Sequence, residues 1–156
     1  METPTMGRVL VTALIENLSD LYLADKGIIP PEQVRRVEVQ DALADVGATV
    51  LWMPRRLIKH LGLEAFQKRC IRTSAGPKPA QLYRGVLLTI MGRDCMIDVA
   101  EASDEGPVVI GMIPLHALDF VVDATTHRLI GNPAHGGQWV YEIYGPIRTA
   151  AAASSR

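Results

Sequence analysis

The residues best placed to do chemistry lie around Asp45, in the run from Ala42 to Leu51. A single carboxylate follows a short apolar, strand-like stretch and precedes a Gly-Ala turn, which predicts an acid where a strand breaks into a loop. An ionisable group in so apolar a segment is costly to bury unless it is paired or shifted in pKa, and such groups gather at functional sites. An Asp that only caps a turn fits the same residues, so both interpretations stay open here.

Two motifs in this sequence resemble a known family. Asp45-Val46-Gly47-Ala48 resembles the Asp-Thr/Ser-Gly-Ala/Ser signature of retropepsin-like aspartic peptidases, with Val46 where the family has a hydroxyl residue. About sixty residues later, the run Val108 to Gly111 is similar to the second hallmark, an apolar-apolar-Gly stretch that enters a short helix, expected over 112–120. The resemblance is to the bacterial single-domain, homodimeric type. It implies a mostly β fold, a retropepsin-like closed β-barrel or sandwich with short helices and one active-site loop per chain.

The resemblance also implies a mechanism. Aspartic peptidases hydrolyse peptide bonds with two carboxylates that share one proton, because like charges so close cannot both ionise cheaply. A chain with one signature supplies half of such a pair, so a homodimer is expected, with Asp45 of each subunit activating a water molecule. The substrate would be a peptide or protein, and no cofactor is implied. The active-site loop would comprise Val46, Gly47, Ala48 and Thr49. The Gly47 N–H would bond the catalytic carboxylate.

Two further regions would contact the substrate. The stretch from Cys70 to Leu82 predicts a hairpin with a tip of small residues, and its position resembles the retropepsin flap that closes over a bound peptide. An ordinary surface hairpin is the alternative. The tip comprises Ser74, Ala75, Gly76 and Pro77. The candidate walls of the side-chain pockets are Met53, Val109, Ile110 and Gly111.

Val46 supports a second hypothesis of a different class. In the family the hydroxyl at this position bonds to the other subunit's loop, and valine keeps the shape but lacks the donor. Each lost hydrogen bond would cost about 0.5–1.5 kcal/mol. The chain would then be a weak or inactive retropepsin-fold module that binds an extended peptide or dimerises without cutting. The two hypotheses differ in whether Asp45→Asn abolishes turnover.

Composition excludes several other functions. The chain has 156 residues, 48% hydrophobic and 21% charged, with a net charge of −1, which fits one globular domain and disfavours nucleic acid as a partner. No apolar run is long enough to span a membrane, and Met1 to Thr5 show no secretion signal. The two cysteines, Cys70 and Cys95, fall on expected strands and read as reduced packing residues of a cytoplasmic protein. Four scattered histidines offer no metal-ligand spacing, so no metal site is expected: His60, His116, His127 and His135.

The elements that would position these residues can be read in order. One domain is expected over 7–148, with 18–32 an insertion at a sheet edge that could cover the cleft, and 149–156 a disordered tail. Five further aspartates are expected on polar turns or strand faces: Asp20, Asp25, Asp98, Asp104 and Asp123. Asp41 lies too close to Asp45 along the same strand to pair with it. Strands are expected over 7–15, 34–45, 50–53, 86–90, 95–99 and 108–111, a final hairpin over 121–133 and a strand up to Tyr144. Helices are expected over 21–26 and 54–62, the second closed by Gly62.

Overall fold

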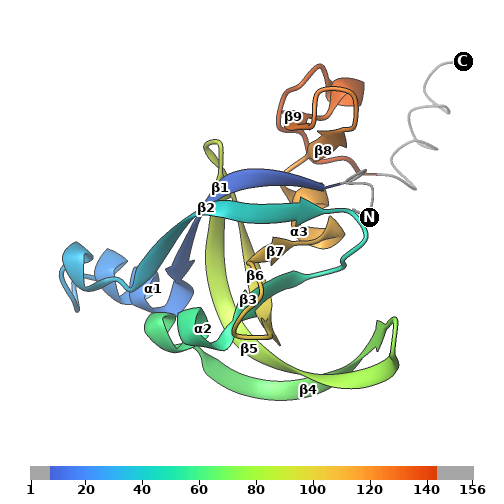
Figure 1. Cartoon of the computed structure of the whole chain (residues 1–156). Coiled ribbons are helices and arrows are strands. Elements are labelled where there is room, and N and C mark those ends of the chain that lie inside the picture. Colours follow the sequence, from blue (N-terminus) through green and yellow to red (C-terminus); the bar gives the residue numbers. More distant parts are fainter. Residues whose placement is uncertain (1–7, 144–156) are drawn as a thin grey trace, which may run out of the picture.

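The computed structural model describes residues 8–143 and confirms that the chain is mostly β (Figure 1). The strands are β1 (Arg8–Asn17), β2 (Arg36–Asp45), β3 (Leu51–Pro54), β4 (Glu64–Thr73), β5 (Gly76–Ile90), β6 (Arg93–Ala102), β7 (Val109–Ile110), β8 (Phe120–Asp123) and β9 (Arg128–Gly131). The helices are α1 (Leu18–Asp25), α2 (Arg55–Leu61) and α3 (Met112–Ala117), with single turns η1 (Pro31–Gln33) and η2 (Pro133–His135). The expected domain ends and the tail over 149–156 lie outside these residues.

The main sheet closes into a barrel, as expected. Its strand order is β1-β2-β7-β3-β6-β5-β4, and β1 also pairs with β5 through residues 14–17 and 86–89. β2 pairs with β7 in parallel, and so does β3 with β6, whereas β3 and β7 are antiparallel. β4 remains outside the ring, paired only with β5. Alternating residues of the ring fill the interior, and Ile15, Leu51, Leu88 and Val99 are completely buried there.

Local signals in the sequence set most of the turns. Helix α2 begins after Pro54 and ends at Gly62, whose φ of 65° is the left-handed conformation that glycine adopts without strain. Asn17 caps α1 by accepting a hydrogen bond from the Asp20 N–H. The β4–β5 hairpin turns at Ser74 and Ala75, because Thr73 pairs with Gly76.

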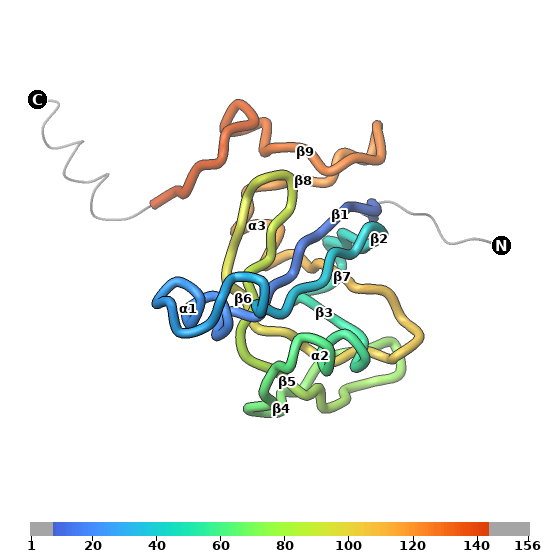
Figure 2. Tube along the Cα trace, turned by 90° about the vertical axis from the view of Figure 1, so that its left-hand side faces the viewer, coloured from blue at the N-terminus to red at the C-terminus, as the bar shows by residue number. Residues whose placement is uncertain are grey.

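Two expectations about elements are wrong. Helix α3 ends at Ala117 rather than Phe120, since Asp119 takes a positive φ of 57° and turns the chain into β8. Residues 138–143 do not form a strand. Their main chain and indole bond instead to Asp119 and Ala117, while Tyr144 lies outside the described residues. Figure 2 shows that the segment from β8 onward runs across one end of the barrel as a separate layer.

Segment 18–32, which was expected to be an insertion, lies at the far end of the barrel from Asp45. Arg8 pairs with Asp45 at one end of the β1–β2 ladder, and Glu16 pairs with Arg36 at the other end, where α1 follows. Asp20 on α1 is buried and binds Arg35 through both carboxylate oxygens, at 2.8 and 3.0 Å, instead of lying on a polar turn. The Arg35 side chain holds the pKa of Asp20 below its usual value. The insertion is therefore fastened away from the Asp45 loop and does not cover it.

Within residues 8–143, no helix has the length and apolar character needed to cross a membrane.

Candidate active site

The Asp45 loop, residues 45–50, is braced by the strand and helix that pass beneath it. β7 runs between β2 and β3, so the chain leaving β7 crosses directly under the loop (Figure 1). The N–H groups of Met112 and Ile113, at the start of α3, donate to the carbonyls of Ala48 and Thr49 at 2.8 and 2.9 Å. The first N–H groups of a helix have no hydrogen-bond partner within the helix. These bonds therefore satisfy both the N–H groups of α3 and the carbonyl groups of the loop, and they fix the loop in place.

Gly111 allows this crossing. A Cβ at position 111 would lie 2.5 Å from the Val50 carbonyl oxygen and 2.6 Å from the Thr49 carbonyl carbon, both main-chain atoms that cannot move aside. The Gly111 N–H donates to the Val50 carbonyl at 2.9 Å. The close contact between Gly111 and the Asp45 loop therefore requires glycine at the end of the second motif. Gly111 is also buried, so it is not available as the pocket wall that was expected.

Asp45 ends β2 with its carboxylate at the surface of the loop. Its Oδ1 accepts a hydrogen bond from the Gly47 N–H at 2.8 Å, as the motif predicts. Its Oδ2 lies 3.2 Å from Nε of Arg8, an exposed side chain on the neighbouring strand. The Asp45 side chain keeps 16% of its surface accessible. The carboxylate is thus oriented by one main-chain donor and paired with an exposed arginine side chain.

The loop is flanked by an apolar rim, defined here as Val46, Met112 and Ile113. These side chains are 46%, 54% and 53% exposed. Met112 and Ile113 are held beside Ala48 and Thr49 by the main-chain bonds already described. Three exposed apolar side chains around one carboxylate are unusual for a surface that faces only water, and such patches mark binding sites.

The strand register corrects two of the expected pocket walls. Met53 and Ile110 are 0% exposed and belong to the barrel core, so neither can touch a ligand. Their neighbours Trp52 and Val109 lie directly opposite each other on the other face of the sheet and are both partly exposed. Because successive side chains of a strand point to opposite faces, Val109 stays a prediction as a pocket wall, and Trp52 replaces its neighbour Met53 as the partly exposed residue of β3.

The face that carries Trp52 continues across the sheet. Paired residues form an unbroken row over five strands, called here the outer row: Val109, Trp52, Ala100, Leu82 and Gln67. Residues paired across strands share a face, so this row leads from the Asp45 end of β7 to the base of the β4–β5 hairpin.

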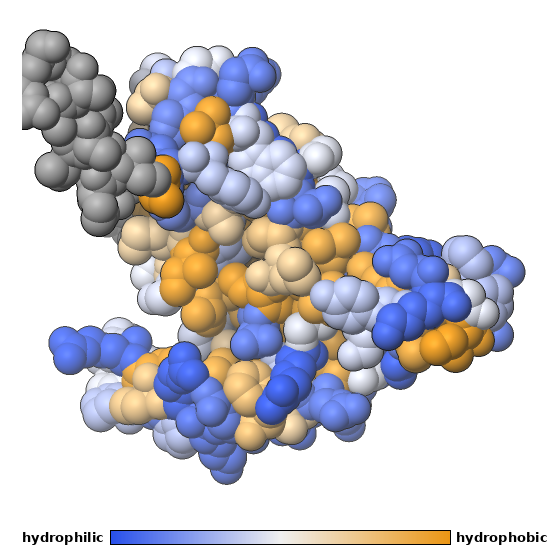
Figure 3. Space-filling model, turned by 180° about the vertical axis from the view of Figure 1, so that it is seen from behind, coloured by the Kyte–Doolittle hydropathy of each residue, from blue (hydrophilic) through white to orange (hydrophobic). Residues whose placement is uncertain are grey.

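The β4–β5 hairpin forms a projecting arm, defined here as residues 66–82. Ser74 and Ala75 are exposed at its tip, whereas Gly76 and Pro77 already belong to β5. The tip and the Asp45 loop project from the same side of the barrel (Figure 1). Figure 3, which views the molecule from behind, shows a hollow between the arm and the body, with apolar surface on the body beside it. An extended peptide would fit between them.

Metal and thiol chemistry find no support in this geometry. Over residues 8–143, no group of three or more potential metal-ligating side chains lies together. Cys70 is exposed on the arm, and burial raises the pKa of Cys95 to about 11. A thiol with so high a pKa is a poor nucleophile.

A second acidic cluster was not foreseen from the sequence. Asp119, 6% exposed, accepts from Asn132 Nδ2 at 3.1 Å, from His135 Nδ1 at 2.7 Å and from the Val140 N–H at 3.1 Å. His135 Nε2 lies 3.0 Å from Glu142. Burial raises the pKa of Asp119, but the hydrogen bonds from His135, Val140 and Asn132 outweigh it and hold the pKa below its usual value. The bond to Asp119 raises the pKa of His135. This Asp119 cluster fastens the C-terminal layer.

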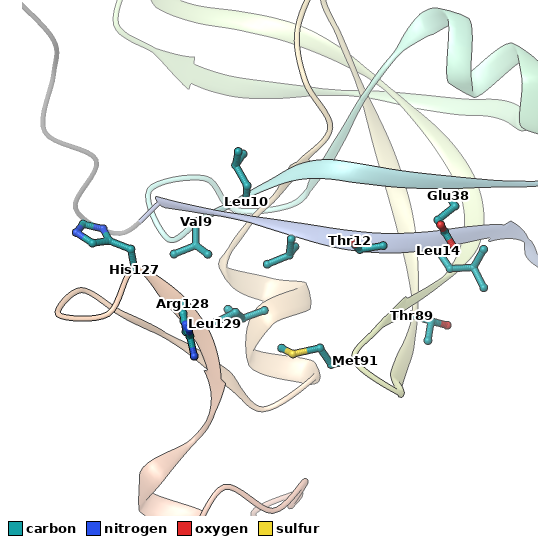
Figure 4. A pocket seen from close by; sticks show the side chains of 11 residues that line it. Val9, Leu10, Thr12, Leu14, Glu38, Thr89, Met91, His127, Arg128 and Leu129 are labelled. Atoms are coloured by element: carbon teal, nitrogen blue, oxygen red, sulfur yellow. The ribbon is translucent and has the colours of Figure 1, made fainter.

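A groove with a volume of about 570 Å³ lies away from the Asp45 carboxylate, between β1, the β5–β6 turn and β9. Val9, Met91 and Leu129 are among the side chains around it (Figure 4). Asp45 does not line it, and its one acidic lining residue is Glu38.

Comparison with known proteins gives one structural likeness. No protein-family model matches the chain, and no curated protein matches its sequence. Among solved structures, the simian foamy virus protease is similar, with 20% sequence identity and a TM-score of 0.43. The match covers 70% of this chain and 93% of the viral one. A likeness of this size does not assign a function, so the chemistry has to come from the chain's own residues.

Proposed function

We propose that this protein is a retropepsin-like aspartic endopeptidase, whose site forms when two copies bring their Asp45 residues together. The observation that carries the proposal is the state of Asp45. Its carboxylate is oriented by the Gly47 N–H at 2.8 Å, on a loop that α3 braces from below, and it keeps 16% of its side-chain surface accessible beside the exposed Arg8. A rigidly presented and accessible carboxylate is what acid–base chemistry on a water molecule requires.

A second copy is needed because one chain supplies one such carboxylate. In the part of the chain that the structure describes, Asp45 forms its ion pair with Arg8. The peptidase mechanism uses two carboxylates with one proton between them, one acting as base toward water and the other as acid toward the substrate carbonyl. A two-fold axis beside Asp45 supplies the second group.

The apolar rim supports such an axis. Val46 follows Asp45 on the loop, Met112 and Ile113 are bonded to the loop at Ala48 and Thr49, and all three side chains are about half exposed in the single chain. A copy related by a two-fold axis would place its own rim against this one and remove both from water, which favours association. The Arg8 side chain, 51% exposed, would have to move from Oδ2 to admit the partner's carboxylate.

The substrate would lie extended between the Asp45 loop and the arm. Val109 and Trp52 are partly exposed on the outer row and would contact apolar side chains of the substrate. Ser74 and Ala75 would cover it as the tip of a flap, excluding water from the reacting bond.

A binding module that does not cut is the second candidate, and Val46 is the observation that favours it. A valine offers no hydroxyl to bond across the axis, so the loop pair would be held by apolar contact alone. In that case Asp45 would serve only to bind Arg8 and the Gly47 N–H.

Cleavage of a diverse peptide pool, read by mass spectrometry from pH 4 to 7, separates the two. The native chain is compared with Asp45→Asn at a concentration where both have the same oligomeric state. Cuts made by the native chain and absent from the variant support the peptidase. Equal patterns from both, or no cuts from a native chain shown to be dimeric, contradict it.

A further inference from the structure

The arm differs in charge from the rest of the molecule. Residues 66–82 contain four basic side chains and no acidic one: Lys68, Arg69, Arg72 and Lys78. All four are exposed, and no ion pair is recorded for any of them within residues 8–143. The chain has 16 Lys and Arg against 17 Asp and Glu, so removing these four leaves 12 against 17. The arm is therefore a cationic element on an otherwise acidic chain.

The register places two of the four cations on the face that continues the outer row. Gln67 pairs with Leu82, Arg69 with Ala80, and Ile71 with Lys78, and these pairs follow one another at two-residue steps on each strand. Cross-strand pairs at even spacing share one face, so Arg69 and Lys78 lie on the same face as Leu82. Lys68 and Arg72 belong to the opposite face, where they pair with Gln81 and Pro77.

The outer row thus changes character along its length. Near the Asp45 loop it presents Val109 and Trp52, and on the arm it presents Arg69 and Lys78. Figure 3 shows the same change, with apolar surface on the body beside the hollow and hydrophilic surface on the tip of the arm. Ala100 and Leu82, between these two ends of the row, are buried. A ligand on this face would therefore contact Val109 and Trp52 near the Asp45 loop and the positive charges of Arg69 and Lys78 on the arm.

We propose that the substrate is an acidic peptide segment, with apolar side chains near the bond to be cut and Asp or Glu side chains further along, beside Arg69 and Lys78. The inference rests on the proposed function, since it names the substrate class of the same site. The four basic side chains of the arm favour an anionic ligand. An extended peptide is favoured among anionic ligands because β4 pairs only with β5 and leaves a strand edge on which a peptide can add as a further strand.

Binding to a variant that cannot cut tests the proposal directly. A fluorescein-labelled twelve-residue peptide with a central Leu-Leu and Glu at outer positions is titrated against Asp45→Asn, and compared with the same peptide carrying Gln or Lys in place of Glu. Exposed ion pairs are each worth at most about 1 kcal/mol, so we expect the Glu peptide to bind about three- to tenfold tighter than the Gln peptide. The Lys peptide should bind more weakly still, and added salt should narrow the differences.

A matched pair of double variants shows which face is responsible. Arg69→Glu with Lys78→Glu should abolish or reverse the preference for Glu. Lys68→Glu with Arg72→Glu changes the net charge by the same amount on the other face of the arm. This second double variant should retain most of the preference for the Glu peptide. An equal loss in both, or equal affinity for the Glu and Gln peptides, overturns the proposal. So does tighter binding of a single-stranded oligonucleotide than of the Glu peptide.

Cleavage by the native chain separates this test from that of the proposed function. If peptides are cut through Asp45 with no acidic preference, the peptidase stands and the acidic substrate is excluded. If Glu peptides bind selectively but are never cut, the charge selectivity stands and the peptidase fails.

Discussion

Asp45 and Asp119 are both carboxylates at the ends of strands, and their surroundings are opposite. Asp119 is 6% exposed and its oxygens accept from Asn132, His135 and the Val140 N–H. Asp45 keeps 16% of its side chain accessible and is held by one main-chain donor and one mobile arginine. Asp119 is thus the more buried and more strongly hydrogen-bonded of the two acids, and Asp45 is the more accessible one.

This difference in surroundings distinguishes an acid that stabilises the fold, Asp119, from the acid proposed to act in catalysis, Asp45. Every hydrogen bond to the Asp119 carboxylate comes from a segment distant in sequence, so the carboxylate holds the layer of residues 132–142 onto the end of the barrel. The loop of Asp45, in contrast, is held from α3 by main-chain bonds from Met112 and Ile113, and its carboxylate binds only the nearby Gly47 N–H and the Arg8 side chain of the adjacent strand. Removing each acid should therefore have a different consequence.

Exchanging each acid for its amide gives the largest effects. Asp45→Asn should lower peptide cleavage by roughly 10²–10⁴-fold, the usual size of acid–base catalysis, with little change in melting temperature. Asp119→Asn should lower the melting temperature by several degrees, because an amide cannot accept all the bonds that the carboxylate accepts. Calorimetry and cleavage assays on both variants check the contrast. It fails if Asp45→Asn destabilises the chain as much as Asp119→Asn.

Gly111→Ala probes the support of the loop. Its Cβ would meet the main chain of Thr49 and Val50 at 2.5–2.7 Å. We expect a loss of about 1–3 kcal/mol in the free energy of unfolding, measured by urea denaturation, together with lower activity. Gly106→Ala is the control, since its Cβ would lie 3.4 Å from the Ser103 carbonyl oxygen and should be tolerated. Similar losses in the two variants would show that the crossing under the loop is not tightly packed.

Val46→Thr tests the hydroxyl that this loop lacks. Val46 is about half exposed in the single chain, so threonine there costs little in the monomer. If two loops meet across a two-fold axis, each new hydrogen bond should strengthen the dimer by about 0.5–1.5 kcal/mol. Sedimentation equilibrium measures the change. Val46→Ala, which shortens the side chain without adding a donor, should instead weaken the dimer.

His135 should make the C-terminal layer sensitive to pH, the smallest effect of the set. The bond to Asp119 raises the pKa of His135. Protonated His135 therefore stabilises the C-terminal layer fully below the ordinary His pKa of about 6.5, and this stabilisation is lost as pH rises through the pKa of the folded state. Protection of the Val140 amide against hydrogen exchange, corrected for intrinsic rates, should fall over that range. His135→Gln should show a flat profile, and a falling one would assign the effect to another group.

The sequence predicts those parts of the fold that depend on neighbours along the chain. Pro54 and Gly62 bound helix α2, and Gly47 bonds Asp45, because each acts within a few residues. The pairing of distant strands was accessible only through the two motifs, and the closed barrel with β7 between β2 and β3 agrees with them.

The errors arose where distant contacts decide. Met53 and Trp52 are equally apolar, and only the register of β3 against β7 shows which faces outward. Residues 138–143 have a strand-like composition, yet their main chain bonds to the Asp119 carboxylate instead of a neighbouring strand. The Asp119 cluster joins residues 13, 16 and 21 positions apart through a residue with positive φ, and no local sequence pattern predicts it.

The central claim is that one site requires Asp45 from two chains, and mixing the native chain with Asp45→Asn tests it most directly. The two are combined in increasing proportion at constant total concentration and allowed to exchange subunits before cleavage is measured. If both carboxylates are required, activity follows the square of the native fraction and an equal mixture retains about one quarter. Activity that falls only in proportion, to about one half, would mean that each chain acts alone and would contradict the shared site.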